Sequence, residues 1–439
     1  MKHLTLIITL LLCTFTTMRA EHTRIIVMSD IGGSDPDDRQ SLIHLLTTLD
    51  KVDMEGFILQ FAWANLDRND QLSATNTIVD VYQRALPNLR VHSKGFPDAD
   101  EVRQMIKFGQ KDAGMKGVGE GKDSPGSELI IKAVDSKDPR PVWIVTWAGT
   151  NTLAQAVWKI QNTRTPEEVK KFISKIRVYD VLGQDDAGAW LTTQHPELTY
   201  IRNKHVYGWA PTDEWTKKNV QEVGELGEVY PNRIWATEGD TPSFLYFLDN
   251  GLNSPEHLDW GGWGGRFDLK KVANIESMDW VKKCGLNEFQ YGTFMMIGSS
   301  KEGVHAINKW KEDIYNNFAA RMKWSVTSDY KDANHHPIAA IGKNCTTAHI
   351  TKKVKAGTTL KLDASRSSDP DGNNLEYEWI FYKEAGTYNG DIQELGNTSR
   401  LDLVVPYDAQ GSKIHLILRV TDNGVPSLTS YRRIVLEVK

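Results

Sequence analysis

Apolar and polar positions change spacing repeatedly along the first three quarters of the chain. Short apolar or β-branched runs, typical of buried strands, occur at residues 24–29, 54–61, 90–92, 142–146, 176–182 and 198–201. Longer stretches with helical spacing occupy residues 41–49, 70–86, 150–160 and 303–324. Strands that alternate with helices predict an α/β domain, in which a mostly parallel sheet is covered by helices on both faces.

The pattern changes after a polar connector at residues 329–336. From Pro337 onward, short alternating runs occupy residues 359–362, 375–379, 401–405, 414–420 and 433–438. Turn-forming segments such as 369–372 and 422–424 separate these runs. Strands at this spacing over about a hundred residues are typical of an immunoglobulin-like β-sandwich. We therefore expect an α/β domain at residues 21–335 and a sandwich at 336–439, with His335 and His336 in the linker.

The first twenty residues have the pattern of a secretory signal peptide. A basic start at Lys2 precedes an apolar run at 4–14, and Ala20 ends a small-residue cleavage site. This run is too short to span a bilayer as a permanent helix, and no other segment is apolar enough. We expect a periplasmic or secreted protein, without stable membrane insertion, that begins at Glu21.

Composition narrows the classes of partner. The net charge is -5, and acidic and basic residues are mixed along the chain, which argues against nucleic acid as a partner. The chain has 14 tryptophans, which serve a large core or offer flat faces for a ligand. After cleavage, Cys284 and Cys345 are the cysteines that remain. A single bridge and two separate thiols both fit the sequence.

An acidic loop follows the first predicted strand. Asp30, Asp35, Asp37 and Asp38 place four carboxylates within nine residues, and no Lys or Arg lies among them. In parallel sheets, ligands bind beyond the carboxyl ends of the strands, where this loop is expected. Carboxylate oxygens are the ligands that Ca²⁺ and Mg²⁺ prefer. The loop therefore predicts a cation site, whereas a solvated turn that caps the next helix would need only one Asp.

The loop resembles the first acidic motif of the inosine–uridine-preferring nucleoside hydrolases. A closer resemblance is to a bacterial family described as cellulose-binding proteins with a nucleoside-hydrolase-like domain and an immunoglobulin-like C-terminal domain. Three segments carry it, at residues 30–38, 238–243 and 263–266. The resemblance covers the mature chain and implies a nucleoside-hydrolase-like sheet, calcium rather than magnesium, and a carbohydrate or nucleoside-like ligand. Because nucleoside hydrolases are commonly oligomeric, it also implies a homo-oligomer.

The resemblance also implies roles for the acidic residues. Asp30 and Asp38 would ligate calcium, Asp37 would hydrogen-bond a sugar hydroxyl, and Asp30 would also accept a proton from water. The turn at residues 147–154 resembles one whose strand-end carbonyl ligates the ion, which places Trp147 in the ligand set. Asp240, between an apolar approach and a predicted helix, is our candidate for the last ligand.

Several side chains are candidates for contacts with the substrate. Asn151 lies in the turn after the strand at 142–146, but an Asn that caps a helix fits there as well. Gln184 and Asp185 follow the strand at 176–182, where a capping role for Asp186 is the alternative. Asn65, beside Trp63 and Asp67, would line the same mouth, although a plain polar loop also accounts for it.

The segment at 260–266 is rich in Gly and Trp. In it, Trp263 could stack on a sugar and Arg266 could clamp an acidic group, as parts of a lid. A glycine-rich turn held by a buried Trp is the alternative. The His–Asp pair that supplies the leaving-group acid in nucleoside hydrolases has no match, and Glu238 and His257 are the candidates to replace it.

Two functions of different classes follow. The first is an exported, metal-dependent hydrolase of N- or O-glycosyl bonds, with Asp30 and Asp37 as catalytic residues. The second is a non-catalytic protein that binds a cellulose-like polysaccharide and has kept the metal site without the acid. Export argues against nucleoside salvage inside the cell, and the appended sandwich favours carbohydrate.

Overall fold

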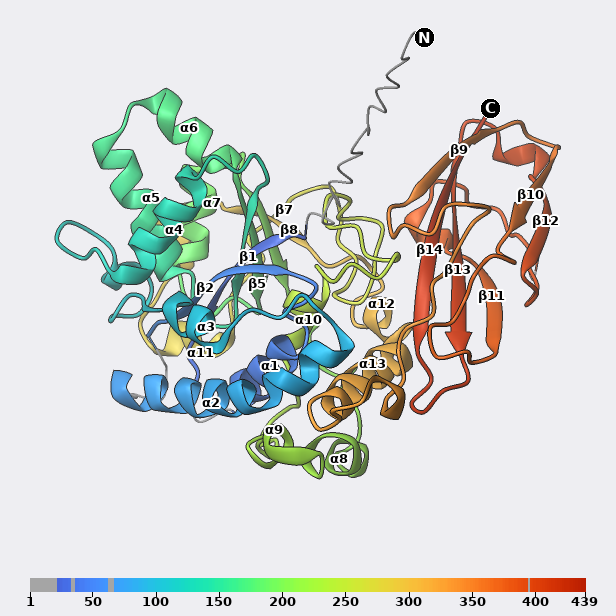
Figure 1. Ribbon diagram of the computed structural model, residues 1–439. Helices are drawn as coiled ribbons and strands as arrows, with labels where there is room; N and C mark the ends of the chain where they lie inside the picture. Colours follow the sequence, from blue (N-terminus) through green and yellow to red (C-terminus); the bar gives the residue numbers. More distant parts are fainter. Residues whose placement is uncertain (1–21, 33–35, 62–66, 394) are drawn as a thin grey trace, which may run out of the picture.

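The structure is a computed structural model that describes residues 22–32, 36–61, 67–393 and 395–439. An α/β domain is followed by a β-sandwich, and helices α12 and α13 lie on the side of the α/β domain that faces the sandwich (Figure 1). Within the described residues, no helix combines the length and apolar character needed to cross a membrane. The predicted signal peptide lies outside the described residues.

The α/β domain is built on a sheet of eight strands in the order β3-β2-β1-β4-β5-β6-β8-β7. All neighbouring strands are parallel except β7 and β8, which are antiparallel. The strands are β1 (Arg24–Ser29), β2 (Asp53–Leu59), β3 (Ile106–Phe108), β4 (Val142–Thr146), β5 (Ile176–Val181), β6 (Thr199–Asn203), β7 (Val272–Ala273) and β8 (Met295–Gly298). This arrangement confirms the predicted mostly parallel sheet.

Helices connect these strands. They are α1 (Asp37–Leu46), α2 (Arg68–His92), α3 (Ala99–Met105), α4 (Pro125–Asp135), α5 (Asn151–Thr163), α6 (Pro166–Ser174), α7 (Ala187–Gln194), α8 (Asp213–Thr216), α9 (Gly224–Glu228), α10 (Thr241–Leu245), α11 (Asp279–Lys283), α12 (His305–Asn308) and α13 (Lys311–Trp324). A π-helical segment, Lys217–Gln221, continues α8.

Two apolar cores cover the two faces of the sheet. Side chains of β1 alternate between them, because successive residues of a strand point to opposite faces. Ile25 and Val27 belong to the core that includes α1, α2 and α13. Ile26 and Met28 belong to the core formed with α4, α5, α6 and α7, which Figure 1 shows together on one side of the sheet. Burial on both faces explains why β1 and β4 read as continuous apolar runs.

Three predicted elements need correction. Residues 90–92 are the last turn of α2 and not a strand, because Leu89 and His92 are buried at helical spacing while Val91 is 39% exposed. The third strand in the chain is β3. The helix expected at 303–324 is divided into α12 and α13, since Trp310 adopts a non-helical conformation between them. Helix α1 begins at Asp37, which places two of the loop carboxylates in its first turn.

The C-terminal domain is a β-sandwich, as predicted. Its sheets have the orders β10-β12 and β11-β13-β14-β9. The strands are β9 (Ile350–Val354), β10 (Thr359–Asp363), β11 (Leu375–Phe381), β12 (Arg400–Val404), β13 (Lys413–Asp422) and β14 (Thr429–Val438). Their inward side chains form a third core around Trp379 and Leu416. Cys284 and Cys345 are both free and exposed, so the alternative of a disulfide bridge between them was wrong.

Asp313 of α13 joins the two domains. Its buried carboxylate accepts two hydrogen bonds from the Arg419 guanidinium, at 2.9 and 2.6 Å, and one from Thr429 Oγ1 at 3.0 Å. The Tyr431 hydroxyl donates a further one. All three donors belong to the sandwich. Because these bonds are charge-assisted and shielded from water, they hold the domains in one orientation.

The two histidines of the connector also hold the domains together, so they form more than the plain linker we expected. The Nδ1 atom of His335 lies 3.0 Å from an Asp371 oxygen. The two ring nitrogens of His336 lie 2.9 Å from the Thr429 carbonyl and 3.0 Å from Asn317 Oδ1. Burial lowers the pKa of His336 to about 3, so this ring is neutral at physiological pH.

We expect that Asp313→Asn lowers the free energy of unfolding by about 1–3 kcal/mol, because the sandwich donors lose a charged acceptor while Arg419 keeps its ion pair with Glu378. Calorimetry of the full chain measures this loss. The matched control is Asp391→Asn, whose carboxylate is 91% exposed beside Lys383 and should change stability by less than about 0.5 kcal/mol. Equal stabilities of the two variants would contradict a dominant role for Asp313.

Candidate metal centre

Three buried carboxylates meet beyond the carboxyl end of the parallel sheet. Asp37 and Asp38 open α1, and Asp240 immediately precedes α10. One oxygen from each lies within 4.8 Å of the others. Opposite ligands of a calcium ion are about 5 Å apart, because each Ca–O distance is 2.3–2.6 Å. The spacing and the donor chemistry therefore fit one hard divalent cation.

The sequence folds locally so as to fix these oxygens. Ser29, the last residue of β1, donates from Oγ to Asp38 Oδ1 at 2.5 Å, and its Oγ accepts the Ile31 N–H at 3.0 Å. Thr241 at the start of α10 donates to Ser41 Oγ in α1 at 2.9 Å. Two segments that are far apart in the chain are thereby clamped, and their carboxylates face each other.

Electrostatics make this arrangement costly without a counter-charge. Carboxylates held within 5 Å of one another repel strongly in a buried site. The N-terminus of α1 offsets only part of this charge, since a helix end carries about half an elementary charge. A divalent cation between the carboxylates would offset more of it.

Asp30 was expected to be both a ligand and the catalytic base. It is partly exposed and directly follows β1 on the same loop. The group of three carboxylates contains Asp37 in its place. The expected ligands Asp38 and Asp240 are therefore brought together, with Asp37 as the third member and not Asp30.

The carbonyl of Trp147 lies at the end of β4, as predicted. It accepts a hydrogen bond from Gln184 Nε2 at 2.5 Å, which places Gln184 against the expected carbonyl ligand. The Trp147 indole is buried, and its Nε1 donates to Ser243 Oγ at 2.8 Å. Ser243 Oγ in turn donates to the Asp240 carbonyl at 2.5 Å. The end of β4 is thus bonded to the segment that carries Asp240.

Asp185 and Asn151 form a buried link between two strand-end turns. The carboxylate of Asp185 accepts the Asn151 and Ala187 N–H groups and the Thr150 hydroxyl, at 3.0–3.1 Å. Asn151 Nδ2 donates to the Asp112 carbonyl at 2.7 Å. Gly149 is required here, because a Cβ atom would lie 2.1 Å from an Asp185 oxygen. These contacts give both side chains a structural role, and the substrate contacts expected of them stay a prediction.

The side chain of Glu238 also forms contacts within the protein. It is buried, one oxygen lies 3.0 Å from His44 Nδ1, and the other accepts the Tyr230 hydroxyl at 2.7 Å. Its backbone N–H donates to Gln40 Oε1 at 2.8 Å. These bonds hold the loop before Asp240, in which Glu238 itself has a positive φ of 51°. The sequence offered no sign of this role, because His44 lies 194 positions away.

The segment at 260–266 is packed into the structure. Trp263 is 2% exposed and donates from Nε1 to Tyr431 of the sandwich at 3.3 Å. Arg266 is buried in an ion pair with Glu302. The alternative interpretation, a glycine-rich turn held by a buried Trp, is the one that the structure supports.

The remaining candidates have other surroundings or cannot be placed. Asn65 and Trp63 lie outside the described residues. Asp67 caps α2 by accepting the Asn69 N–H at 2.8 Å. The His257 ring stacks on Trp260 with centroids 3.7 Å apart. Burial lowers the pKa of His257, so it is neutral at pH 7 and a poor proton donor.

Tyr207 is a neighbour of the centre that the sequence analysis missed. A Cβ atom on Gly239 would lie 2.4 Å from the Tyr207 ring and 2.8 Å from Asp37 Oδ2. The ring and the carboxylate therefore both lie against the same glycine, beside Asp240. Its position after β6 (199–203) was the available signal, because residues after the strands gather at this edge of the sheet.

We expect the free energy of unfolding to change with pH as Asp185 ionises. Burial raises its pKa to about 7, so between about pH 4 and pH 7 the folded carboxyl holds a proton that the unfolded chain has released. The carboxyl therefore costs more stability as pH rises. Relative to the wild type, Asp185→Asn should gain about 4 kcal/mol of unfolding free energy between pH 4 and pH 7. Urea unfolding at several pH values measures the difference, and parallel curves for the two proteins would refute it.

Residues 24–267 match a family model described as the cellulose-binding Sde182, nucleoside hydrolase-like domain. Residues 359–438 match one described as the C-terminal domain of the cellulose-binding protein Sde0182. No curated protein matches the chain.

A solved structure is similar over nearly the whole chain. It is described as a nucleoside hydrolase-related hypothetical protein from Saccharophagus degradans that is associated with carbohydrate metabolism. It is 43% identical, the match covers 95% of this chain and 100% of the other, and the TM-score is 0.90. The chain belongs to the family of cellulose-binding proteins with a nucleoside hydrolase-like domain, as its motifs indicated.

Proposed function

We propose that this chain is an exported, calcium-dependent hydrolase of N- or O-glycosyl bonds that acts on a carbohydrate or nucleoside-like substrate. One observation carries the proposal: three buried carboxylates from two distant segments meet within 4.8 Å at the ligand-binding edge of a parallel sheet. Membership of a nucleoside hydrolase-like, cellulose-binding family supports it.

The proposed ligands are Asp37, Asp38, Asp240 and the Trp147 carbonyl. All four are oxygen donors, which suits calcium, and magnesium would need a smaller and more regular shell. Bound calcium would orient a water molecule and sugar hydroxyls and lower the pKa of that water. Asp30, partly exposed on the same loop, is the carboxylate that we propose as general base for the water. The ionised carboxylates would stabilise positive charge that develops at the anomeric carbon.

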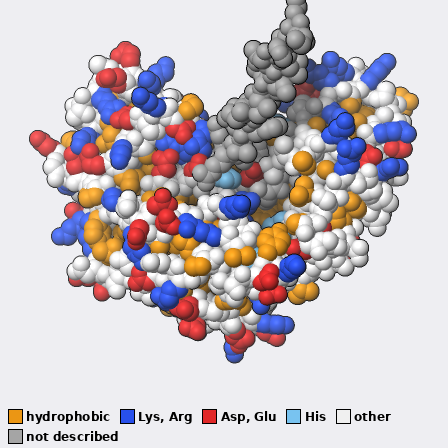
Figure 2. Space-filling view, viewed as in Figure 1, with side chains coloured by type: hydrophobic (Ala, Val, Ile, Leu, Met, Phe, Trp, Pro, Cys, Tyr) orange, Lys and Arg blue, Asp and Glu red, His pale blue; other side chains and the backbone are white. Residues whose placement is uncertain are grey.

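The segment before Asp240 carries exposed apolar side chains that could contact a ligand. Trp235, five positions before Asp240, is 73% exposed, and Ile234 beside it is 60% exposed. Exposed indoles offer flat apolar faces, which suit the ring of a sugar. Figure 2 shows acidic and basic side chains mixed over one face of the molecule, without a basic stripe on that face.

A non-catalytic carbohydrate-binding protein is the second candidate. It is favoured by the surroundings of the two residues considered as leaving-group acids. Both oxygens of Glu238 are engaged with His44 and Tyr230, and His257 is stacked on Trp260. Without a proton donor, a poor leaving group departs slowly. Such a protein would use the metal centre to bind sugar hydroxyls alone.

We expect the full chain to bind one calcium ion and to lose that affinity in Asp240→Asn. Replacing one carboxylate ligand should weaken binding by at least about a hundredfold, since even supporting residues contribute about 10–100-fold. Calorimetric titration of protein stripped with a chelator measures the affinity. Calcium should also raise the melting temperature of the wild type, because it binds the folded state. Asp391→Asn is the control, and unchanged affinity in Asp240→Asn would refute the proposed centre.

Turnover separates the two candidate functions. We expect hydrolysis of at least one aryl glycoside, oligosaccharide or nucleoside when calcium is present, and loss of that activity on chelation. Asp30→Asn should lower kcat by about 10²–10⁴-fold while calcium affinity changes little, as for removal of a general base. Sedimentation with insoluble cellulose tests binding in parallel. Binding to cellulose with no turnover of any substrate would contradict the hydrolase and favour the second candidate.

A further inference from the structure

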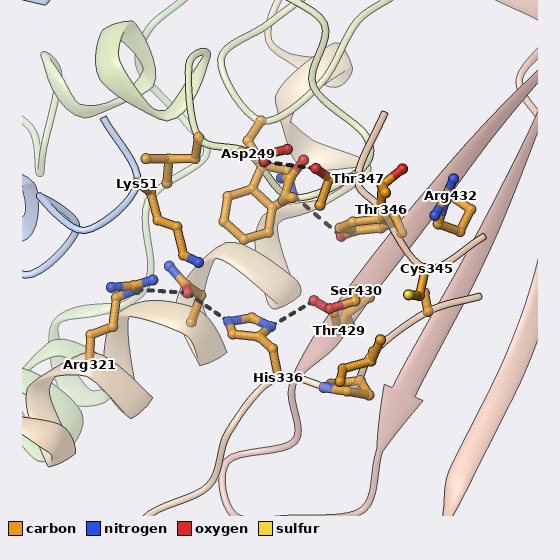
Figure 3. A pocket seen from close by; sticks show the side chains of 18 residues that line it. Lys51, Asp249, Arg321, His336, Cys345, Thr346, Thr347, Thr429, Ser430 and Arg432 are labelled. Atoms are coloured by element: carbon orange, nitrogen blue, oxygen red, sulfur yellow. Dashed lines mark hydrogen bonds between the residues drawn. The ribbon is translucent and has the colours of Figure 1, made fainter. Parts of the chain in front are cut away.

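A second cavity lies between the two domains, in a different place from the metal centre. Its volume is about 260 Å³. Lys51 and Arg321 reach it from the α/β domain, Ser430 and Arg432 approach from the sandwich, and His336 of the connector lies between them (Figure 3). The wall is therefore built by both domains and exists only when they are docked.

Cations outnumber anions around this cavity. Lys51, Arg321 and Arg432 line it, and Asp249 is the only carboxylate among the described residues of the lining. Behind the wall, Asp50 lies 2.6 Å from Arg321 and 3.9 Å from Lys51. Two carboxylates thus face three cations. His336 adds no charge at neutral pH, since its ring is neutral there.

Arg432 is the cation of the wall without a direct ion pair, and the attraction of Asp249 offsets only part of the cost of burying its charge. Its side chain is almost fully buried, and its two terminal nitrogens donate only to the neutral oxygens of Asn344 and Ala348, at 3.0–3.2 Å. It forms no ion pair with any part of the chain that the structure describes. Its Nε has no hydrogen-bond partner there. Burial of a guanidinium without a direct ion pair is unfavourable, so an anion in the cavity would relieve part of that cost.

Neutral groups of the wall suit a ligand rich in oxygen. Asn250 and Asn317 each have a buried amide Nδ2 without a hydrogen-bond partner in the described structure. Thr346 and Ser430 contribute hydroxyl groups. An apolar part of the wall is formed by Leu248, Trp263, Pro337, Ile338 and Ala339. Hydrogen-bonding groups beside an apolar face match a sugar ring, whose edges are polar and whose faces are not.

The size of the cavity limits the ligand. Pockets for drug-sized molecules are typically 300–1,000 Å³. A volume of about 260 Å³ is below that range. It holds a single sugar ring but no oligosaccharide, and it is larger than an inorganic anion requires.

We propose that this interdomain cavity binds one acidic monosaccharide, a uronate. Its carboxylate would lie among Lys51 and Arg432, and its hydroxyls would bond the amide and hydroxyl groups of the wall. The site is independent of the proposed calcium centre. Because both domains build it, occupancy would stabilise their docked arrangement.

Titration of the full chain with D-galacturonate and D-glucuronate, in the presence of a chelator, tests the proposal. Calorimetry and the fluorescence of the tryptophans follow binding. We expect at least one uronate to bind with a Kd of about 1 mM or lower. D-Galactose and inorganic sulfate should bind at least about tenfold more weakly, because galactose lacks the carboxylate and sulfate lacks the sugar ring with its hydroxyls. Lys51→Met should weaken uronate binding about tenfold or more.

Two variants serve as controls. Lys51 is 40% exposed, so Lys51→Met should fold normally, and Lys170→Met removes an exposed lysine of α6 without affecting uronate binding. Asp240→Asn should also bind uronate normally, even if the metal centre fails its own tests. Absence of uronate binding, equal binding of sulfate, or loss of binding in Asp240→Asn but not in Lys51→Met would each overturn the proposal.

Discussion

Mutual repulsion among Asp37, Asp38 and Asp240 is the constraint on which the rest of the structure depends. Their oxygens lie within 4.8 Å of one another in a buried setting, and the chain holds them there through hydrogen bonds that link residues 200 positions apart. Ser29 orients Asp38, and Ser243 orients the Asp240 backbone. A positive charge between the three carboxylates would relieve this repulsion.

The sequence predicted the sheet, the sandwich and the acidic loop, because each rests on local spacing or on a compact motif. It failed where distant residues decide the outcome. Helix α2 extends through residues 90–92, since Leu89 and His92 pack together on one helix face. Glu238 looked like a ligand-binding acid, but His44 and Tyr230 occupy its oxygens. The sequence left open whether Trp263 lies in a lid or in a buried turn, and its contact with Tyr431 of the sandwich favours the turn.

The sequence predicted Asp30 in the carboxylate group, whereas the structure has Asp37 there, and the cause is similar. A motif gives the order of the acids along the chain, but it does not show which of them α1 will turn inward. Asp37 and Asp38 are both buried in the first helical turn, whereas Asp30 remains partly exposed after β1. Asp240 comes next to that turn through the Thr241–Ser41 hydrogen bond and the loop in which Glu238 contacts His44, and both contacts join residues far apart in the chain.

The carboxylate of Asp313 has a mechanical consequence. A rotation of the sandwich about the connector would deprive Arg419, Thr429 and Tyr431 of their shared acceptor at the same moment. The sandwich is therefore held in a fixed orientation relative to the α/β domain and does not move freely about the connector. If the sandwich rests on a solid polymer, the carboxyl end of the parallel sheet stays at a fixed height and angle above that surface. The shape of the protein then determines which part of the polymer this end can reach.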